Sequence, residues 1–460
     1  MRKRRWRGRF GERDSGKIVA RGVPPRVLRR MKDGSSDGLL RRAALHFGTP
    51  FYLYDFDVIE RRVRDLRRAL GPRFEIAFAV KANPSLGILS FLSRLGLSSD
   101  VASRGELLAV RRAGCPPSKI LSTGPAKSDA DLEALVRARV SQIHVEGEWE
   151  MEALESIAGK LGRRVRIGLR LNPPWGIAEK RVIIGGPGAK KFGFDLRSAE
   201  KVLRMKRDRG AFAHLELCGF QVFNASNVLD ARLLLENTER VLSLALSFSK
   251  KFSVPLRSVD FGGGFGVPYA DGERPLDLKI LQKGFGAITR RVGDEPLLRG
   301  TRLVFEPGRF LVAESGTYVV RVLGTKRSRG VEYVLVDGGI HHFLRPVLFG
   351  TPHGVRLLPE GGGRRPQPSS PSKKSLVISG PLCTSLDVLH ASARLPSPRR
   401  GDLVAFENAG AYGYSESMPL FLSHEWPAEV GLRKGRLALL RRPPSVKALL
   451  AAQRPTPPRL

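Results

Sequence analysis

The feature that most constrains this 460-residue chain is a regular alternation of short β-rich runs with helix-length amphipathic segments, starting at residue 74 and ending at 306. Such runs predict buried strands, and the segments between them predict helices that cover a sheet. Eight units in succession are typical of a (β/α)8 barrel. A doubly wound open sheet is the structural rival, but no dinucleotide fingerprint follows the first run. The expected strands are Phe74–Lys81, Leu97–Ala102, Ile120–Thr123, Gln142–Glu146, Val165–Leu171, Leu215–Val222, Ser258–Phe261 and Leu303–Glu306.

The pattern changes after Glu306, where further β-rich runs follow without helices of the same rhythm. We therefore expect an α/β fold in which a (β/α)8 barrel is joined to a second, C-terminal β-rich domain. The run Phe51–Tyr54 predicts an N-terminal strand that the barrel region shares with the β domain. The expected divisions are a loose basic tail over 1–40, the barrel over 41–310, the β-rich domain over 311–435 with a flexible Gly/Pro/Ser-rich insertion near 360–374, and a basic tail over 436–460.

Charge and cysteine content narrow the class of protein. The formal net charge is +35, which attracts anionic partners non-specifically, but the basic residues are spread along the chain. We therefore expect no specific nucleic-acid partner. No apolar run approaches the roughly 20 residues that cross a bilayer, so no membrane span is expected. Three distant cysteines (Cys115, Cys218 and Cys383) rule out a disulfide scaffold and a cysteine-only zinc site, and they predict a cytoplasmic protein.

Polar residues at the predicted strand ends are candidates for catalysis, because barrel active sites gather there. Lys81 closes the first apolar run. Partial desolvation at such a place is expected to lower the pKa of a lysine and to free its amine as a nucleophile toward an aldehyde. The alternative is a lysine that only reaches past the strand rim to solvent.

Two more strand ends carry suggestive groups. A glycine triplet, Gly262–Gly264, follows the seventh run, where backbone N–H groups could cradle a phosphate; the alternative is an ordinary turn. Glu306 and Arg309 follow the eighth run. They could hold a protonated ring nitrogen and a substrate carboxylate respectively, or could simply pair with each other or with neighbours. An amine, a phosphate cradle and an acid together predict pyridoxal 5′-phosphate as cofactor, with no metal.

The chain also resembles the diaminopimelate/ornithine-type decarboxylases, which are pyridoxal phosphate enzymes of the alanine-racemase-like fold. The resemblance runs from about Phe51 to Glu425, and overall it favours diaminopimelate decarboxylase. The motifs that carry it are Phe78–Pro84, Asp100–Leu107, Lys191–Gly193, Asp260–Gly264, Glu306–Arg309, Gly380–Cys383 and Gly410–Tyr414.

The resemblance implies a role for each matching residue. Lys81 should bind the cofactor covalently and Cys383 should donate a proton during the reaction, with Cys383 serving the partner's site in a homodimer that shares its active sites. Glu306 should pair with the pyridine nitrogen. The implied cofactor-binding residues are Lys81, Asp100, Phe223, Ser226, Gly262, Gly263, Gly264, Glu306 and Tyr412. The implied substrate-binding residues are Arg309, Arg345, Phe349 and Thr384.

Three departures from the family's pattern concern the cofactor ring and the distal end of the substrate. Phe223 stands where the family has histidine; it can stack on the cofactor ring but lends no charge. Thr384 replaces a glutamate that helps to hold the distal amine, and Phe349 replaces a tyrosine. Burying an ammonium without a carboxylate partner costs several kcal/mol of discrimination.

These observations predict an amino-acid decarboxylase, with meso-diaminopimelate as the default substrate. One alternative is a decarboxylase of another amino acid, free or bound to a carrier protein, in secondary metabolism. A basic protein would suit an acidic carrier. An alternative of another class is a pyridoxal-phosphate-binding protein without catalytic activity, which the retention of Cys383, Arg309 and Glu306 disfavours.

Overall fold

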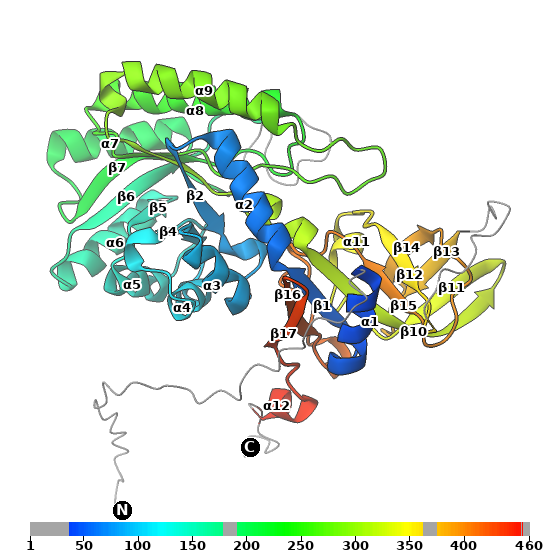
Figure 1. Cartoon of the computed structure of the whole chain (residues 1–460). Coiled ribbons are helices and arrows are strands. Elements are labelled where there is room, and N and C mark those ends of the chain that lie inside the picture. The colour runs from blue at the N-terminus through cyan, green and yellow to red at the C-terminus, as the bar shows by residue number, and fades with distance from the viewer. Residues whose placement is uncertain (1–35, 178–190, 362–374, 452, 454–460) are drawn as a thin grey trace, which may run out of the picture.

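The computed structural model describes residues 36–177, 191–361, 375–451 and 453. Figure 1 shows the two parts of the described chain side by side: a barrel wrapped in helices, and a β-rich domain. Of the expected flexible segments, residues 1–35 and 362–374 lie outside the described residues. The end of the expected N-terminal tail is helical, because Leu40, Ala43 and Ala44 of α1 (Ser36–Phe47) are buried against the β domain.

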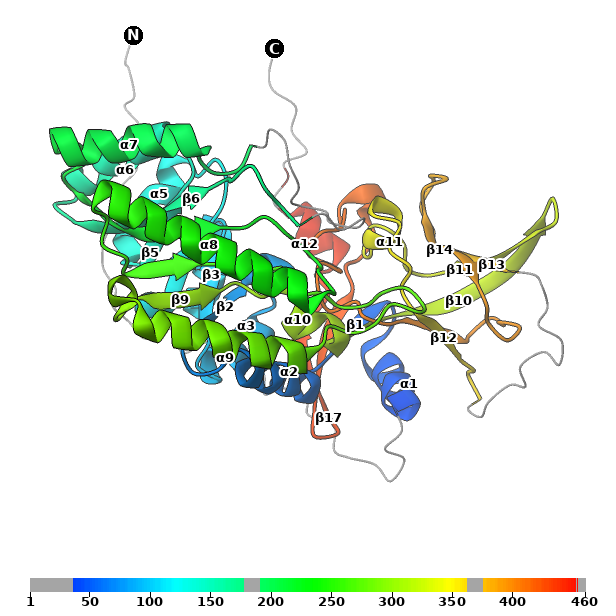
Figure 2. The ribbon, with the colours of Figure 1, turned by 90° about the horizontal axis from the view of Figure 1, so that it is seen from above.

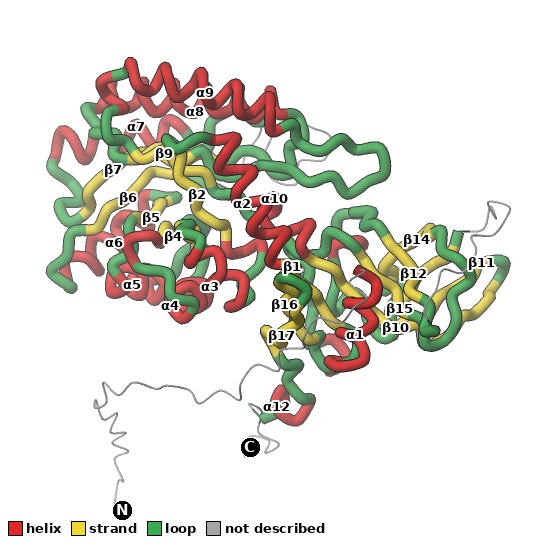
Figure 3. The backbone as a smooth tube through the Cα atoms, in the orientation of Figure 1, coloured by secondary structure: helices red, strands yellow, loops and turns green. Residues whose placement is uncertain are grey.

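Eight parallel strands close into a barrel, which confirms the predicted fold class. Each expected run overlaps one of these strands, because a strand buried on both faces is a nearly continuous apolar run that is easily recognised. Figure 3 shows the strands enclosed by the helices. The barrel strands are β2 (Phe74–Ala79), β3 (Ser98–Val101), β4 (Ile120–Ser122), β5 (Gln142–Val145), β6 (Val165–Leu171), β7 (Leu215–Val222), β8 (Ser258–Asp260) and β9 (Arg302–Phe305).

The barrel helices begin at polar caps and bury one face against the strands. Ser128, for example, forms a reciprocal capping box with Asp131 at the start of α5. Figure 2 shows α8 and α9 lying along the outside of the barrel. The helices of this part are α2 (Phe56–Leu70), α3 (Leu86–Arg94), α4 (Arg104–Arg112), α5 (Asp129–Ala138), α6 (Glu148–Lys160), α7 (Leu196–Arg209), α8 (Ala231–Phe252), α9 (Leu278–Asp294) and α10 (Arg309–Val312).

The second part is a nine-stranded mixed sheet in the order β14-β13-β11-β10-β1-β16-β17, with β15 pairing with β10 and β12. One hydrophobic core runs through both parts, so that Tyr52 and Tyr318 of the sheet belong to the same cluster as Phe305 of the barrel. The strands are β1 (Phe51–Asp55), β10 (Gly316–Ser328), β11 (Val331–Val336), β12 (Val355–Leu358), β13 (Leu376–Ser379), β14 (Val388–Ala393), β15 (Leu403–Phe406), β16 (Ala428–Arg433) and β17 (Arg436–Arg441). Two short helices complete the described chain, α11 (Arg345–Leu348) and α12 (Val446–Leu450).

One expected boundary is wrong. Residues 436–441, assigned from the sequence to a basic tail, form β17, which pairs antiparallel with β16 and ends the sheet. Arginines at both ends of this strand hide its strand character, yet charged residues are common on edge strands, where they discourage pairing with other molecules. Strand β1, before the barrel, lies in the same sheet, antiparallel to β10 and parallel to β16.

None of the helices in the described residues is long and apolar enough to cross a membrane.

Candidate active site

Lys81 lies in a 3-10 turn, Val80–Ala82, directly after β2. Ala79, at the end of β2, pairs with Asp100, the last residue but one of β3. The β domain holds the turn from the other side, because the Tyr412 N–H donates to the Ala82 carbonyl at 2.7 Å. Lys81 is therefore fixed where the barrel mouth meets the β domain.

The Lys81 side chain is exposed, since it stands in the open pocket rather than in packed core. Its Nζ lies 5.3 Å from the centroid of the Phe223 ring. Desolvation lowers the pKa of Lys81, but the negative charge of Asp100, with Tyr412 and Glu306, raises it by more, so the pKa lies above its ordinary value. The expectation of a lowered pKa was wrong, because the sequence argument considered desolvation without the carboxylates that other strands bring close.

The glycine triplet after β8 packs so closely that side chains would not fit. A Cβ on Gly263 would lie 2.6 Å from the Glu306 carbonyl oxygen, and one on Gly262 would lie 2.7 Å from Cδ2 of Phe223. Gly264 has a φ of +106°, a conformation that favours glycine. Close packing against Phe223 and Glu306 therefore requires glycine at these positions, and Gly263 and Gly264 present their backbone to the pocket that Lys81 lines, as a phosphate cradle requires.

Glu306, after β9, is buried and held by two donors. The Thr123 hydroxyl donates to Oε1 at 3.1 Å, and the Gln221 amide donates to Oε2 at 3.2 Å. Thr123 in turn lies 2.7 Å from Nδ1 of His144, whose Nε2 lies 3.0 Å from Nε2 of Gln142. These partners orient Glu306 toward the pocket.

His144 supports Glu306 as a neutral ring. Desolvation, together with the charges of Lys127 and Arg170, lowers the pKa of His144 to about 3. The partners then assign the hydrogen: Nδ1–H donates to Thr123, and Nε2 accepts from Gln142. His144, Asp260 and Glu306 lie within 4.8 Å of one another, as metal ligands could, but both ring nitrogens are already engaged. We therefore assign His144 to the positioning of Glu306.

Two further buried carboxyl groups, those of Asp100 and Asp260, face this region. Within the described part of the chain, each has one oxygen without a hydrogen-bond partner, Oδ1 of Asp100 and Oδ2 of Asp260. Desolvation raises the pKa of both carboxyls, and the charge of Glu306 adds to the effect. Carboxyl groups whose charged form is disfavoured in this way would be stabilised in that form by a ligand with a positively charged ring nitrogen.

The predicted substrate residues Arg309 and Arg345 belong to a stack of aromatic rings and guanidinium groups. Arg309 lies over the rings of Tyr269 and Tyr412, at 5.7 and 4.9 Å from their centroids. The Arg345 guanidinium lies over the same Tyr412 ring, 5.1 Å from its centroid, and 4.8 Å from the centroid of the Phe349 ring. Such contacts hold the two arginines in fixed planes. Tyr412 therefore links the predicted cofactor residues to the predicted substrate residues.

Arg345 has an acidic partner that the sequence motifs do not indicate. Its Nη1 lies 2.5 Å from a carboxylate oxygen of Glu416. The Arg345 side chain is 2% exposed, whereas that of Glu416 is 34% exposed. The positive charge expected to read a substrate carboxylate is thus already neutralised.

Eight of the fourteen predicted site residues line one pocket. Asp100, Gly262, Arg345 and Phe349 are not among its lining residues, and neither are Cys383 and Thr384. These two lie in the loop between β13 and β14, which Asp387 holds by accepting the N–H groups of Ile340 and Leu382. Cys383 is exposed on this loop. The eight are Lys81, Phe223, Ser226, Gly263, Gly264, Glu306, Arg309 and Tyr412.

Residues 56–313 match the protein family described as the pyridoxal-dependent decarboxylases, in its pyridoxal-binding domain. The chain belongs to the pyridoxal-dependent decarboxylases. Its cofactor is pyridoxal phosphate, and the glycine triplet and the buried carboxylates described above fit that molecule. This decarboxylase is an amino-acid carboxy-lyase.

Decarboxylases of more than one substrate are among its relatives. It is 32% identical over 419 residues to the L-glutamyl-[BtrI acyl-carrier protein] decarboxylase of Niallia circulans, covering 88% of this chain and 94% of that protein. It is 34% identical over 371 residues to the diaminopimelate decarboxylase of Helicobacter pylori J99, covering 80% and 87%. The crystal structure of the Helicobacter pylori enzyme complexed with L-lysine matches with a TM-score of 0.77 at 30% identity, covering 90% and 98% of the two chains.

Sequence reasoning missed part of this decarboxylase's site. Thr123 lies at the end of a predicted strand, a positional signal that could have found it, whereas His144 lies inside β5. Gln221 lies inside β7 and points inward, and Tyr269 and Glu416 lie in loops, where no periodicity marks them. Their roles emerge only from contacts between residues that are far apart in the sequence.

Proposed function

We propose that this decarboxylase acts on an α-amino acid whose distal end is uncharged, as in an amino acid carried on an acyl carrier protein. The observation that carries the proposal is the Arg345–Glu416 pair, which removes the free charge at the place where a distal group would be read. Phe349 and Thr384 add no charge there. A distal group joined to a carrier is neutral, so it needs no ionic partner.

The carrier-bound form has two further supports. The relative that acts on a glutamyl carrier protein aligns with 88% of this chain. The net charge of +35 favours encounter with an acidic protein through long-range attraction.

meso-Diaminopimelate is the second candidate, and one observation favours it. Its distal end carries both an ammonium and a carboxylate, and Arg345 and Glu416 together offer the complementary pair of charges. Several relatives are diaminopimelate decarboxylases. For this substrate to bind, the ion pair must open and both charges must find new partners.

For the chemistry itself, we propose that Lys81 binds the cofactor covalently, the glycine triplet with Ser226 and Tyr412 holds its phosphate, and Phe223 stacks on its ring. Bound pyridoxal phosphate draws electrons from the bond between the substrate's Cα and its carboxylate, which allows CO2 to leave. Glu306 keeps the ring nitrogen protonated. Arg309 positions the substrate carboxylate, and Cys383 delivers a proton to the product carbon.

We further propose a cytoplasmic homodimer in which Cys383 and Thr384 complete the partner's site. Their loop does not line the pocket of their own Lys81. Exposed apolar side chains, including Leu386, Phe349 and Leu420, suit a surface that a second copy covers.

The experiment is CO2 release from a panel of substrates. It comprises meso-diaminopimelate, free glutamate, lysine, and glutamate linked through its side chain to a carrier protein or to pantetheine. The proposal expects the linked substrate to give the highest kcat/KM. A clear preference for meso-diaminopimelate would establish the second candidate instead.

A further inference from the structure

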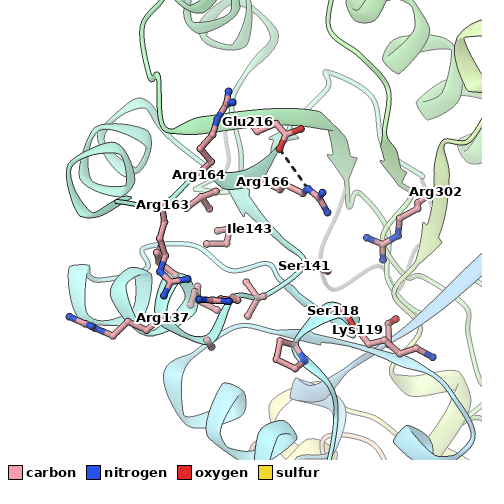
Figure 4. A pocket seen from close by; sticks show the side chains of 18 of the residues that line it. Ser118, Lys119, Arg137, Ser141, Ile143, Arg163, Arg164, Arg166, Glu216 and Arg302 are labelled. Carbon is pink, nitrogen blue, oxygen red and sulfur yellow. Dashed lines mark ion pairs between the residues drawn. The ribbon is translucent and has the colours of Figure 1, made fainter. Parts of the chain in front are cut away.

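Two hollows open at opposite ends of the barrel. The one at the amino-terminal end of the strands has a volume of about 1230 Å³ and is rich in arginine. In Figure 4, the side chains of Arg163 and Arg164 point away from each other, and Arg166 lies 3.6 Å from Glu216, so this hollow selects no ligand. The pocket of the candidate active site is smaller, and one of its lining residues is the polar Asn227.

Asn227 lies beside the groups proposed to hold the phosphate of the cofactor. It follows Ser226 in the loop after β7 and lines the pocket together with Ser226, Gly263 and Gly264. The residue is partly exposed, so the pocket has access to it. Its φ is +56°, in the left-handed region that asparagine adopts more readily than most residues do.

One hydrogen bond fixes which end of the Asn227 amide is free. The Val267 N–H donates to Oδ1 of Asn227 at 3.0 Å. Because a backbone N–H pairs with the oxygen of an amide and not with its nitrogen, this bond assigns the two ends of the side chain. Within the ranges that the structure describes, Nδ2 has no hydrogen-bond partner. It is also accessible, unlike the amide of Asn224, whose two polar atoms are buried without a partner.

The bond to Val267 is one of three that join the loop after β7 to the loop after β8. The Val228 N–H donates to the Gly264 carbonyl at 2.8 Å, and the Gly266 N–H donates to the Val228 carbonyl at 2.9 Å. Asn227 is therefore held at a fixed place against the glycine triplet. A donor that is fixed before the ligand arrives binds it with little further loss of freedom.

A purely structural role would not require asparagine at this position. Aspartate also adopts the left-handed conformation, and its carboxylate would accept the Val267 N–H equally well. Asparagine differs from aspartate in two respects, its neutral charge and its two N–H donors. Both differences favour an anionic ligand whose oxygens only accept hydrogen bonds, such as a phosphate.

We propose that Asn227 is a further ligand of the cofactor phosphate, donating from Nδ2 to a phosphate oxygen while Oδ1 holds the loop after β8. The inference rests on the proposed placement of the phosphate at the glycine triplet, Ser226 and Tyr412. A hydrogen bond to a charged oxygen is stronger than one between neutral groups. Asn227 therefore favours the phosphorylated cofactor over pyridoxal, which lacks the phosphate.

The deciding variant is Asn227→Asp. It keeps an oxygen for the Val267 N–H and tolerates the same φ, but it replaces the donor with a negative oxygen that faces the phosphate. The measurement is the Kd of pyridoxal phosphate and of pyridoxal for the apoenzyme, prepared from the full-length protein and titrated by absorbance. Affinity for pyridoxal phosphate should fall at least about thirtyfold, affinity for pyridoxal less than about threefold, and the Tm should not fall.

Two further variants separate the possible causes. Asn408 has a φ of +55°, donates from Nδ2 to the Pro268 carbonyl at 3.1 Å, and is not a lining residue of the pocket. Asn408→Asp therefore adds the same charge in the same backbone conformation, and it should lower the Tm but leave the ratio of the two Kd values within about threefold of wild type. Ser226→Ala tests the proposed placement of the phosphate and should change that ratio about tenfold.

Each other result would overturn the proposal in a distinguishable way. If Ser226→Ala changes the ratio and Asn227→Asp does not, the phosphate lies where proposed but Asn227 is not its ligand. If neither variant changes the ratio, the proposed placement of the phosphate is itself wrong. Equal changes in Asn227→Asp and Asn408→Asp would mean repulsion by the added charge alone. Equal losses for pyridoxal phosphate and pyridoxal in Asn227→Asp would mean damage to the pocket as a whole.

Discussion

Arg345 and Glu416 form an ion pair of 2.5 Å beside the Tyr412 ring, and of the two side chains only the arginine is buried. A buried guanidinium needs a partner, because an unpaired buried charge is costly. Glu416, which is partly exposed, can therefore be viewed as a substitute for a substrate carboxylate. Under the proposed function, this relationship decides which distal groups the enzyme accepts.

Glu416→Gln should change substrate choice rather than abolish activity. It removes the carboxylate and leaves Arg345 able to bind a distal substrate carboxylate, so kcat/KM for 2-aminoadipate should rise roughly tenfold, the worth of one charged hydrogen bond. An amino acid with an uncharged distal end should change little. The measurement is CO2 release, with Glu407→Gln, which removes an exposed carboxylate elsewhere in the β domain, as control. A fall for every substrate would mean that Glu416 only holds Arg345 in place.

Thr384→Glu with Phe349→Tyr should raise kcat/KM for meso-diaminopimelate, by roughly tenfold or more. The new glutamate gives the distal ammonium a charged partner, and the tyrosine adds a hydroxyl contact. A competition assay on the wild type and the double variant measures the change, with an uncharged substrate as internal reference. Strong preference of the wild type for meso-diaminopimelate would show that other residues already read the distal amine.

Much of the fold follows from local sequence pattern, and the exceptions have a physical cause. All eight barrel strands were predicted, because each is a short apolar run between amphipathic segments. In β17, only Leu437 is fully buried and arginines stand at both ends, so the pattern resembles a tail. Edge strands depend on one neighbour alone, and their sequences show it weakly.

The site was predictable where chemistry lies at strand ends, and less so where it depends on contacts between residues that are distant in the sequence. Lys81, Glu306 and the glycine triplet were found by position. The direction of the Lys81 pKa was not, because Asp100 reaches it only when β2 and β3 pair. Glu416 meets Arg345 from 71 residues away, through a loop that no periodicity describes.

Covalent capture of the cofactor by Lys81 should depend on pH and on Asp100. Capture needs the neutral amine, and the raised pKa of Lys81 keeps that form scarce at pH 7. Below the pKa, the capture rate of the apoenzyme should rise about tenfold for each pH unit. Asp100→Asn removes the charge that raises the pKa and should speed capture near pH 7, whereas the surface variant Asp277→Asn should not. Stopped-flow absorbance of bound cofactor measures both, and identical pH profiles would refute the role of Asp100.

Thr123→Val should reduce kcat more than it changes KM. The variant keeps the shape of the side chain but removes the hydroxyl that bridges His144 and Glu306. Among the residues that the structure describes, Gln221 is then the one side chain that still donates a hydrogen bond to Glu306. We expect kcat to fall roughly tenfold and the free energy of unfolding to fall by about 1–3 kcal/mol. Thr238→Val, which removes a buried hydroxyl bonded to the Leu234 carbonyl, is the control. The Thr238→Val variant should lose stability but keep its kcat. Equal losses of kcat in the two variants would mean that Thr123 contributes to catalysis only through the stability of the fold.

Mixing two impaired variants should restore activity if the homodimer shares its sites. The Lys81→Ala variant cannot capture the cofactor. The Cys383→Ala variant should still bind the cofactor but should lose most of its turnover. In a mixed dimer, the Cys383 of the Lys81→Ala chain serves the intact Lys81 of its partner, and the other site has neither residue. Random pairing makes half of the dimers mixed, so about a quarter of wild-type activity should return. Co-expression with two different tags and assay of the doubly purified fraction would isolate mixed dimers, where about half should return. If both residues served the same chain's site, each site of a mixed dimer would lack one of them, and no activity beyond that of the separate variants would appear.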